Sequence, residues 1–214
     1  MRDAYGSYIL RTGQHDAWER LFNRYMFESR FRDRNEIIDL GPGRCAFTKL
    51  APERIIAVDN SPAVVDHYKS EGLHIRLGSA DNLPFSDCSM DAVYSCWLLE
   101  HLDDPVMALR ETKRVLRPNG YGLFIVPSVR SLTRGFYNDY THIRPYSPQS
   151  LAQVARAASL TNFSAKHLFW TKGLRRLVPL MGDQRMMGLL RLNDSMGRNF
   201  RCVNRDNLMF ELWT

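Results

Sequence analysis

The chain has few cysteines and no long apolar run. Its 214 residues include four cysteines, which form no C-x-x-C pair and no zinc-finger spacing; they are Cys45, Cys88, Cys96 and Cys202. This pattern favours reduced thiols over a disulfide framework or a structural zinc site. No apolar stretch of about 18 residues occurs, and the first residues lack the apolar segment of a signal peptide. We therefore expect a cytoplasmic protein without a membrane span.

The composition is that of one domain with a basic surplus. Hydrophobic residues make up 44% of the chain, enough for one core, so residues 1–214 are expected to form a single domain. Basic residues outnumber acidic ones by 29 to 23, giving a net charge of +6 and a sequence pI near 9.3. Such a surplus favours anionic partners, although it also simply keeps a protein in solution.

An apolar run that leads into a glycine turn is the most informative motif. Residues 37–40 precede Gly41-Pro42-Gly43, and residues 44–51 are expected to form a helix. Glycine tolerates positive φ and lets backbone approach a ligand, while a helix N-terminus directs N–H groups at a carboxylate or phosphate. A second apolar run, 55–58, ends in Asp59, a position from which a carboxylate can hold both hydroxyls of a ribose.

The spacing Gly41-x-Gly43-x-x-Ala46 also fits the NAD-binding motif, so the loop alone leaves the cofactor open. Four later segments follow in a fixed order: 78–85 (GSADNLPF), 90–93 (MDAV), 99–101 (LEH) and 114–120 (RVLRPNG). Together these motifs resemble the class I S-adenosylmethionine-dependent methyltransferases, particularly the ubiquinone and menaquinone biosynthesis branch. The resemblance covers about residues 35 to 130 and implies an enzyme with S-adenosylmethionine as its cofactor.

The same resemblance implies which residues bind this cofactor. They are Asp39, Gly41, Pro42, Gly43, Asp59, Asn60, Ala80, Asp81, Cys96 and Trp97. In such a site the glycines lie against the methionine moiety and Asp59 holds the ribose. Asp39 would support the loop or cap its turn. Asp81 would accept from the adenine amino group or remain a solvated loop carboxylate. Trp97 would shape the pocket or pack in the core.

The chain departs from the family at two positions. Cys45 stands where a third glycine is usual, and a thiol is tolerable there if φ is negative. Ser79 stands where relatives often have aspartate. His101, in the LEH motif, is expected to orient backbone rather than move protons.

Alternating strand and helix patterns predict the fold. Strands are expected at 36–40, 55–58, 73–77, 91–96, 121–126, 162–171 and 207–213, and helices within 14–32 and at 44–51, 62–70, 104–117 and 147–158. With the resemblance, this pattern indicates a Rossmann-like, doubly wound α/β fold. Its seven-stranded sheet would be mostly parallel, with an antiparallel last strand.

Three segments outside the core 35–130 are expected on the substrate side: 1–34, 131–147 and 172–205. The last is methionine-rich and carries eight basic and two acidic residues, or +6. It would be a lid over a bulky apolar or anionic acceptor, a surface for anionic lipid, or a helical pair packed on the sheet edge.

The loop 136–146 contains three tyrosines, a carboxylate, an imidazole and a guanidinium. We expect His142, oriented by Asp139, to act as general base for a hydroxyl and Arg144 to clamp a phosphate or carboxylate. The alternative is that His142 and Arg144 fix the loop to the next helix. Methyl transfer requires no metal, because the cofactor carries the activated group.

The leading hypothesis is O-methylation of a small molecule: a glycan, lipid-linked or natural-product hydroxyl or acid. An NAD-type oxidoreductase is less favoured, because the sequence has no Tyr-x-x-x-Lys. A nucleic-acid methyltransferase is favoured by the high pI, but this chain lacks the Asn/Asp-Pro-Pro-aromatic tetrad that methylation of a base amino group would predict. A non-catalytic S-adenosylmethionine-binding partner protein is favoured only by Cys45 and Ser79. Peripheral membrane contact fits the basic segment, and the acceptor and oligomeric state stay open.

Overall fold

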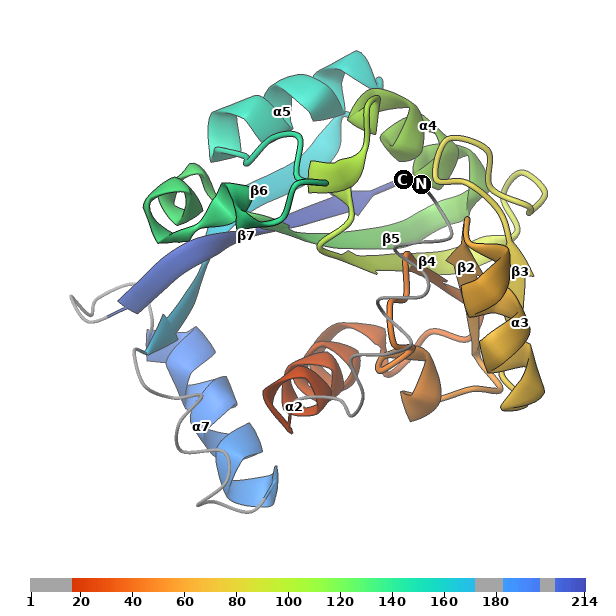
Figure 1. Cartoon of the computed structure of the whole chain (residues 1–214), viewed down its shortest axis with the longest axis horizontal. Coiled ribbons are helices and arrows are strands. Elements are labelled where there is room, and N and C mark those ends of the chain that lie inside the picture. Colours follow the sequence, from red (N-terminus) through yellow and green to blue (C-terminus); the bar gives the residue numbers. More distant parts are fainter. Residues whose placement is uncertain (1–16, 172–182, 197–202) are drawn as a thin grey trace.

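The structure is a computed structural model that describes residues 17–171, 183–196 and 203–214. One seven-stranded sheet forms its centre (Figure 1). The strands are β1 (Ile37–Leu40), β2 (Ile55–Asp59), β3 (Ile75–Leu77), β4 (Met90–Cys96), β5 (Leu116–Pro127), β6 (Asn162–Thr171) and β7 (Val203–Trp213). Their order is β3-β2-β1-β4-β5-β7-β6. Strands β1 to β5 pair in parallel, and β7 is antiparallel to both neighbours. The predicted Rossmann-like, doubly wound sheet is confirmed.

Helices cover both faces of this sheet. They are α2 (Ala17–Met26), α3 (Pro62–Ser70), α4 (Pro105–Val115), α5 (Pro148–Ala157) and α7 (Asp183–Met196), with a π-helical turn at Phe27–Phe31. In Figure 1, α4 and α5 lie above the sheet, while α2 and α7 lie below it. Because the sheet is covered on both sides, functional side chains are left to the loops at the strand ends.

The helices α4 and α5 begin at the predicted signals. The Asp104 carboxylate accepts hydrogen bonds from the N–H groups of Val106 and Met107. Ser147 and Ser150 form a reciprocal capping box. Such caps satisfy N–H groups that have no partner inside the helix.

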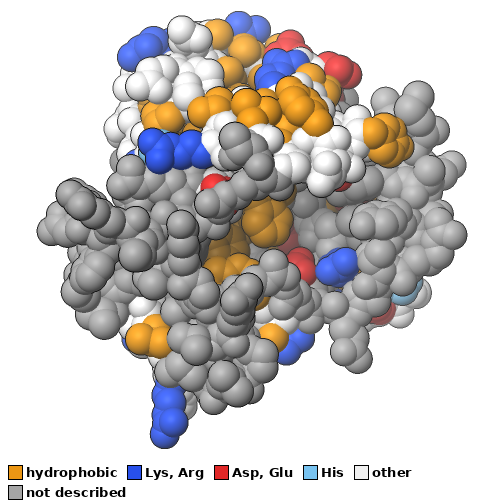
Figure 2. All heavy atoms as spheres, turned by 60° about the vertical axis from the view of Figure 1, so that its left-hand side comes forward, with side chains coloured by type: hydrophobic (Ala, Val, Ile, Leu, Met, Phe, Trp, Pro, Cys, Tyr) orange, Lys and Arg blue, Asp and Glu red, His pale blue; other side chains and the backbone are white. Residues whose placement is uncertain are grey.

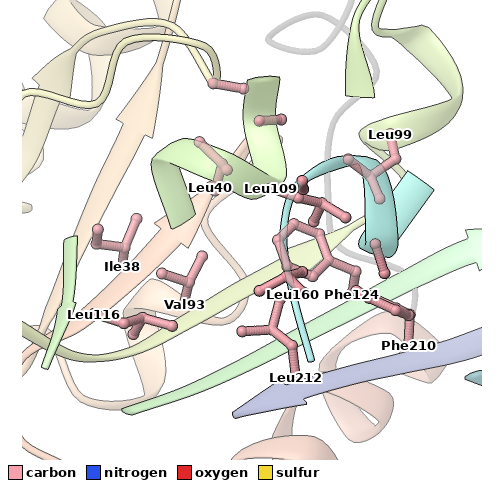
Figure 3. Packing of buried hydrophobic residues seen from close by; sticks show 14 of the residues in the cluster. Ile38, Leu40, Val93, Leu99, Leu109, Leu116, Phe124, Leu160, Phe210 and Leu212 are labelled. Carbon is pink, nitrogen blue, oxygen red and sulfur yellow. The ribbon is translucent and has the colours of Figure 1, made fainter. Parts of the chain in front are cut away.

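Buried side chains of the described residues form three hydrophobic clusters, and the two largest follow from the alternation of side chains along the strands. Ile37 and Leu123 belong to the core between the sheet and the helices α2 and α7. Ile38 and Phe124 belong to the core between the sheet and the helices α4 and α5. Figure 3 shows the second core, in which side chains from the strands, α4 and the segment after α5 converge. Each fully buried side chain of this size contributes about 1.5–3 kcal/mol by its removal from water.

One predicted helix is absent. Residues 44–51 form turns and a single 3-10 turn at Thr48–Leu50. Cys45 has a left-handed backbone with a φ of 57°, which an α-helix cannot contain. In addition, the backbone N–H and the hydroxyl of Thr48 donate to the Asp39 carboxylate at 3.2 and 2.6 Å. The prediction of an anion-binding helix N-terminus after the glycine turn is therefore wrong.

Two strands start earlier than predicted. β5 begins directly after α4, at Leu116, and β7 begins at Val203 rather than at residue 207. None of the helices in the described ranges is both long and apolar enough to cross a membrane.

Part of the basic segment 172–205 packs against the body of the domain. Residues 172–182 and 197–202 lie outside the described residues, but α7 lies beside α2 and β6. Met187 and Leu190 are buried in the same hydrophobic core as Ile37 and Leu123. In addition, Arg191 Nη2 lies 3.1 Å from Glu28 Oε2. For α7, these contacts favour packing on the sheet edge over a detached lid.

If α7 is a packed element, shortening Leu190 should destabilise the whole domain. We expect Leu190→Ala to lower the free energy of unfolding by about 2–5 kcal/mol, since it leaves a cavity in a core position. Gln184→Ala, on the exposed side of α7, should change it by less than about 0.5 kcal/mol. Urea unfolding measures both, and equal effects would contradict the packing of α7.

Candidate active site

The carboxyl ends of β1, β2 and β4 surround a cavity of about 470 Å³. The glycine turn forms one wall, and the segment after β4 forms another. Tyr140 and Thr141, from the loop after β5, close its far end. A cavity of this size at the carboxyl ends of parallel strands is where open α/β sheets bind small molecules.

The glycine turn has a left-handed backbone at both glycines, with φ of 67° at Gly41 and 54° at Gly43. A Cβ atom at Gly41 would lie only 3.0 Å from Leu98 Cδ1, and any larger residue there would also be strained by the positive φ. A Cβ at Gly43 would meet nothing within 4 Å. The turn thus brings bare backbone to the cavity wall, as the sequence predicted.

The end of β2, next to the glycine turn, carries the predicted ribose partner. Asp59 ends β2 and lines the cavity with Asn60, and its Oδ1 accepts from the N–H of Ser61 at 2.8 Å. Ser79 and Ala80 line the same cavity. Asp81 is exposed and does not line this cavity, so its predicted contact with adenine has no support.

A smaller cavity of about 250 Å³ lies beyond the glycine turn. The two cavities share Gly41, Gly43 and Trp97, and the smaller one is also lined by Asp39, Pro42 and Cys96. Trp97 is 42% exposed, which excludes simple core packing. Its indole stacks on Phe22 and its Nε1 donates to Asn207 Oδ1 at 3.1 Å. Trp97 therefore stands at the junction of the two cavities.

Buried carboxylates give these cavities an acidic lining. Burial raises the pKa of Asp39 to about 7, although hydrogen bonds from Thr48 oppose the effect. Burial also raises the pKa of Asp59. In the smaller cavity, Arg44 Nη1 lies 3.4 Å from Glu19 Oε2, so the negative charge of Glu19 offsets the positive charge of Arg44. A cationic ligand suits such walls better than an anionic one.

A second polar group lies beside Tyr140 and Thr141. Asp139 Oδ1 accepts from the Thr141 hydroxyl at 2.6 Å, and the same hydroxyl lies 2.9 Å from His101 Nδ1. His101 lines the large cavity, and its ring centroid lies 4.7 Å from that of His142. Burial, and then the neighbouring His142, lowers the pKa of His101. Hydrogen bonds from Thr141 hold the pKa of Asp139 below its usual range, against the effect of partial burial.

These contacts correct the predicted pairing of Asp139 with His142. The carboxylate bonds to Thr141, two residues ahead, whereas His142 Nδ1 lies 2.6 Å from the carbonyl oxygen of Phe136. The Arg144 guanidinium donates to the carbonyl of Asp103 at 3.1 Å and lines neither cavity. These contacts favour the structural role for Arg144.

Sequence reasoning missed Glu100. It is completely buried, and burial raises the pKa of its carboxyl to about 8. The only signal was a carboxylate within the apolar segment Leu98-Leu99-Glu100-His101-Leu102. Buried glutamates are rare unless they are paired, so such a position indicates a polar site.

Comparisons with known proteins agree with this geometry. Residues 38–124, which contain the glycine turn and Asp59, match the family described as methyltransferase domain. In this part the chain is similar to the class I S-adenosylmethionine-dependent methyltransferases. The cofactor of this enzyme class is S-adenosylmethionine.

Among similar proteins, an uncharacterized methyltransferase of Schizosaccharomyces pombe is 38% identical over 135 residues, 54% of this chain and 47% of that protein. A demethylmenaquinone methyltransferase of Symbiobacterium thermophilum is 25% identical, over 73% of this chain and 68% of that protein. The chain spans about half the length, or less, of several curated relatives it matches. The crystal structure of a methyltransferase from Archaeoglobus fulgidus shares the fold, with a TM-score of 0.67 and 18% identity over 91% and 93% of the two chains.

Replacement of Cys45 by glycine and by alanine separates backbone strain from packing. Both variants lose the thiol, but only glycine also loses the Cβ atom. A residue that has a Cβ atom is destabilised by roughly 1–2 kcal/mol in a left-handed backbone conformation. We expect Cys45→Gly to be more stable than Cys45→Ala by about 1 kcal/mol in urea unfolding. At Ala63, within α3, glycine should instead destabilise by about 0.5–1 kcal/mol. The same sign at both positions would contradict strain at Cys45.

Ionisation of Asp39 should make the stability of the cofactor-free protein pH-dependent. Its pKa is about 7 when folded and close to 3.8 when unfolded, so the folded state holds the proton more tightly. Its stabilising effect is complete below about pH 4 and is lost as the pH rises through about 7. Relative to Asp39→Asn, the wild type should lose on the order of 4 kcal/mol over this interval, at about 1.4 kcal/mol per pKa unit. Parallel stability profiles of the two proteins would contradict this assignment.

Proposed function

We propose that the protein transfers a methyl group from S-adenosylmethionine to an oxygen atom of a small-molecule acceptor. The observation that carries the proposal is one cavity with two kinds of wall. The glycine turn and Asp59 line one part of it, and His101 and Thr141 line another. The first part would hold the cofactor and the second the acceptor, so both reactants would meet beside Trp97.

The charges support S-adenosylmethionine over a nicotinamide dinucleotide. The sulfonium of S-adenosylmethionine is cationic, whereas a dinucleotide carries an anionic pyrophosphate. A pyrophosphate is normally held by a helix N-terminus, and residues 44–47 form turns instead. The carboxylates of Asp39 and Asp59 on the cavity walls would repel an anion and attract the sulfonium.

The acceptor end supports transfer to oxygen. In such a reaction the bond from sulfur to the methyl carbon breaks and keeps its electron pair on sulfur, while a bond from oxygen to that carbon forms. The proton of the attacking hydroxyl must leave. The imidazole of His101, whose pKa is lowered, is neutral at pH 7 and lines the cavity, so it can accept this proton.

The surface beside the cavity supports an acceptor that is partly apolar. Val129, Leu132, Tyr137, Tyr140 and Ile143 are large hydrophobic residues exposed within one short segment, and Tyr140 is 79% exposed. On the face shown in Figure 2, hydrophobic side chains gather on the described surface above a hollow that is also partly hydrophobic. Such a patch on a monomer commonly marks a binding surface.

Loss of the Asp59 carboxylate should weaken cofactor binding. We expect Asp59→Ala to reduce the binding free energy of S-adenosylmethionine by about 1.5–3 kcal/mol, the range for hydrogen bonds to a charged group. Asp66→Ala, which removes an exposed carboxylate of α3, should leave it unchanged. Isothermal titration calorimetry with S-adenosylmethionine, its demethylated product and NAD measures the effect.

Equal affinity in the wild type and Asp59→Ala would remove the ribose assignment, and binding of NAD alone would remove the cofactor assignment. Transfer itself is tested by incubation with S-adenosylmethionine and small-molecule extracts. The expected result is S-adenosylhomocysteine together with a product that gains one methyl group by mass spectrometry. Binding without transfer to any extract would support a non-catalytic partner protein instead.

A further inference from the structure

The buried carboxylate of Glu100 is the least satisfied polar group near the cavity. Glu100 is 0% exposed, and neither of its carboxylate oxygens has a hydrogen-bond partner on another described residue. A buried carboxylate without a partner is costly, so it is normally retained for a ligand or for catalysis. What lies next to it therefore decides its role.

Two imidazoles share its surroundings. One ligating atom from each of Glu100, His101 and His142 can be chosen so that all three lie within 4.8 Å of one another. Two histidines and one carboxylate are the ligand set of many catalytic zinc and non-haem iron sites. Such a set leaves open coordination positions for a substrate.

Hydrogen bonds orient both imidazoles as metal ligands are usually oriented. The Thr141 hydroxyl donates to Asp139, so it accepts from His101, and Nδ1 of His101 must carry the hydrogen. The carbonyl of Thr141, at 3.3 Å, is a second acceptor for the same N–H. The Phe136 carbonyl likewise requires a hydrogen on His142 Nδ1. In the neutral rings Nε2 then keeps the lone pair, which is the arrangement found in metal-bound histidines.

Backbone contacts hold the two segments of the cluster together. The N–H groups of Ile143 and Arg144 donate to the carbonyl of Glu100 at 2.8 and 3.4 Å. The Tyr146 hydroxyl donates to the carbonyl of Leu99 at 2.9 Å. The loop that carries His142 is thereby fixed on the turn that carries Glu100 and His101, and a metal site requires such fixed ligands.

We propose that Glu100, His101 and His142 form a binding site for one divalent first-row transition-metal ion beside the cavity, whose wall includes His101. Two nitrogens and one oxygen favour Zn²⁺, Mn²⁺ or Fe²⁺ over Mg²⁺, which prefers oxygen ligands. The role of the ion rests on the function proposed above. With the ion bound, the lone pair of His101 would be occupied and could not accept the proton. An acceptor oxygen bound at an open position would have a lowered pKa, so its hydroxyl proton would pass to solvent water instead, before the oxygen attacks the methyl group.

The experiment uses untagged protein treated with a chelator and then titrated calorimetrically with Zn²⁺. Co²⁺ provides a second probe, because its visible absorption reports on its ligands. We expect one ion per chain in the wild type. Glu100→Gln and His142→Gln, which keep similar volumes, should each lower Zn²⁺ affinity by more than about tenfold, the lower bound known for residues that merely orient ligands.

His74→Gln is the matched control, because it removes an exposed imidazole in a different part of the chain. It should bind Zn²⁺ and Co²⁺ as the wild type does. Because all three variants keep the cysteines, any metal binding by thiols is common to them and cannot explain a loss of affinity in the ligand variants. Thermal unfolding without metal identifies any variant that fails to fold, and two independent ligand variants keep the test decisive if one does.

Unchanged Zn²⁺ affinity in both ligand variants would overturn the metal site. Methyl transfer that survives the chelator would show that the cluster acts as a proton acceptor only. The outcome is separable from the cofactor assignment, because Asp59→Ala should lose S-adenosylmethionine affinity and keep Zn²⁺ affinity. A wild type that binds Zn²⁺ through Glu100 but binds no S-adenosylmethionine would retain this site and remove the proposed function.

Discussion

The hydrogen bonds from Thr48 to Asp39 determine the shape of the cofactor side of this molecule. They join the end of β1 to a residue nine positions later. The chain between them must therefore turn back on itself, and it does so with left-handed backbone at Gly41, Gly43 and Cys45. Only glycine adopts this conformation without strain, so the two hydrogen bonds to a buried carboxylate help to offset the strain at Cys45. Both cavities open against the resulting turn.

The fold could largely be predicted because its signals are local. Strand patterns, the capping residue Asp104 and the capping residue Ser147 each act within a few residues, and each marks a real boundary. The helix predicted at 44–51 is the informative failure. Its composition is compatible with a helix, but the contact of Thr48 with Asp39 lies outside any local pattern. Propensity is a weak guide where tertiary contacts oppose it.

The candidate site divides in the same way. Gly41 and Asp59 could be placed together from the sequence, because neighbouring parallel strands bring their carboxyl ends to one edge of the sheet. The hydrogen-bond partner of Asp139 could not be predicted from the sequence. Several polar groups lie within three residues of it, and spacing does not decide among them; the carboxylate forms a local turn with Thr141. Glu100 lies in the LEH motif, but its apolar neighbours predict only a buried segment, so the sequence assigns it no role.

Electrostatics links the two halves of the site. The chain carries a net charge of +6, of which the segment 172–205 alone supplies eight basic and two acidic residues. Yet Asp39 and Glu100 are buried, and Asp59 is half-buried, at or beside the cavities. Each such carboxylate opposes folding unless a proton or a cation neutralises it. A sulfonium at the glycine turn and a divalent ion at Glu100 would each neutralise the acids nearest to them. Two cations would also repel each other, which favours an acceptor oxygen with negative charge between them.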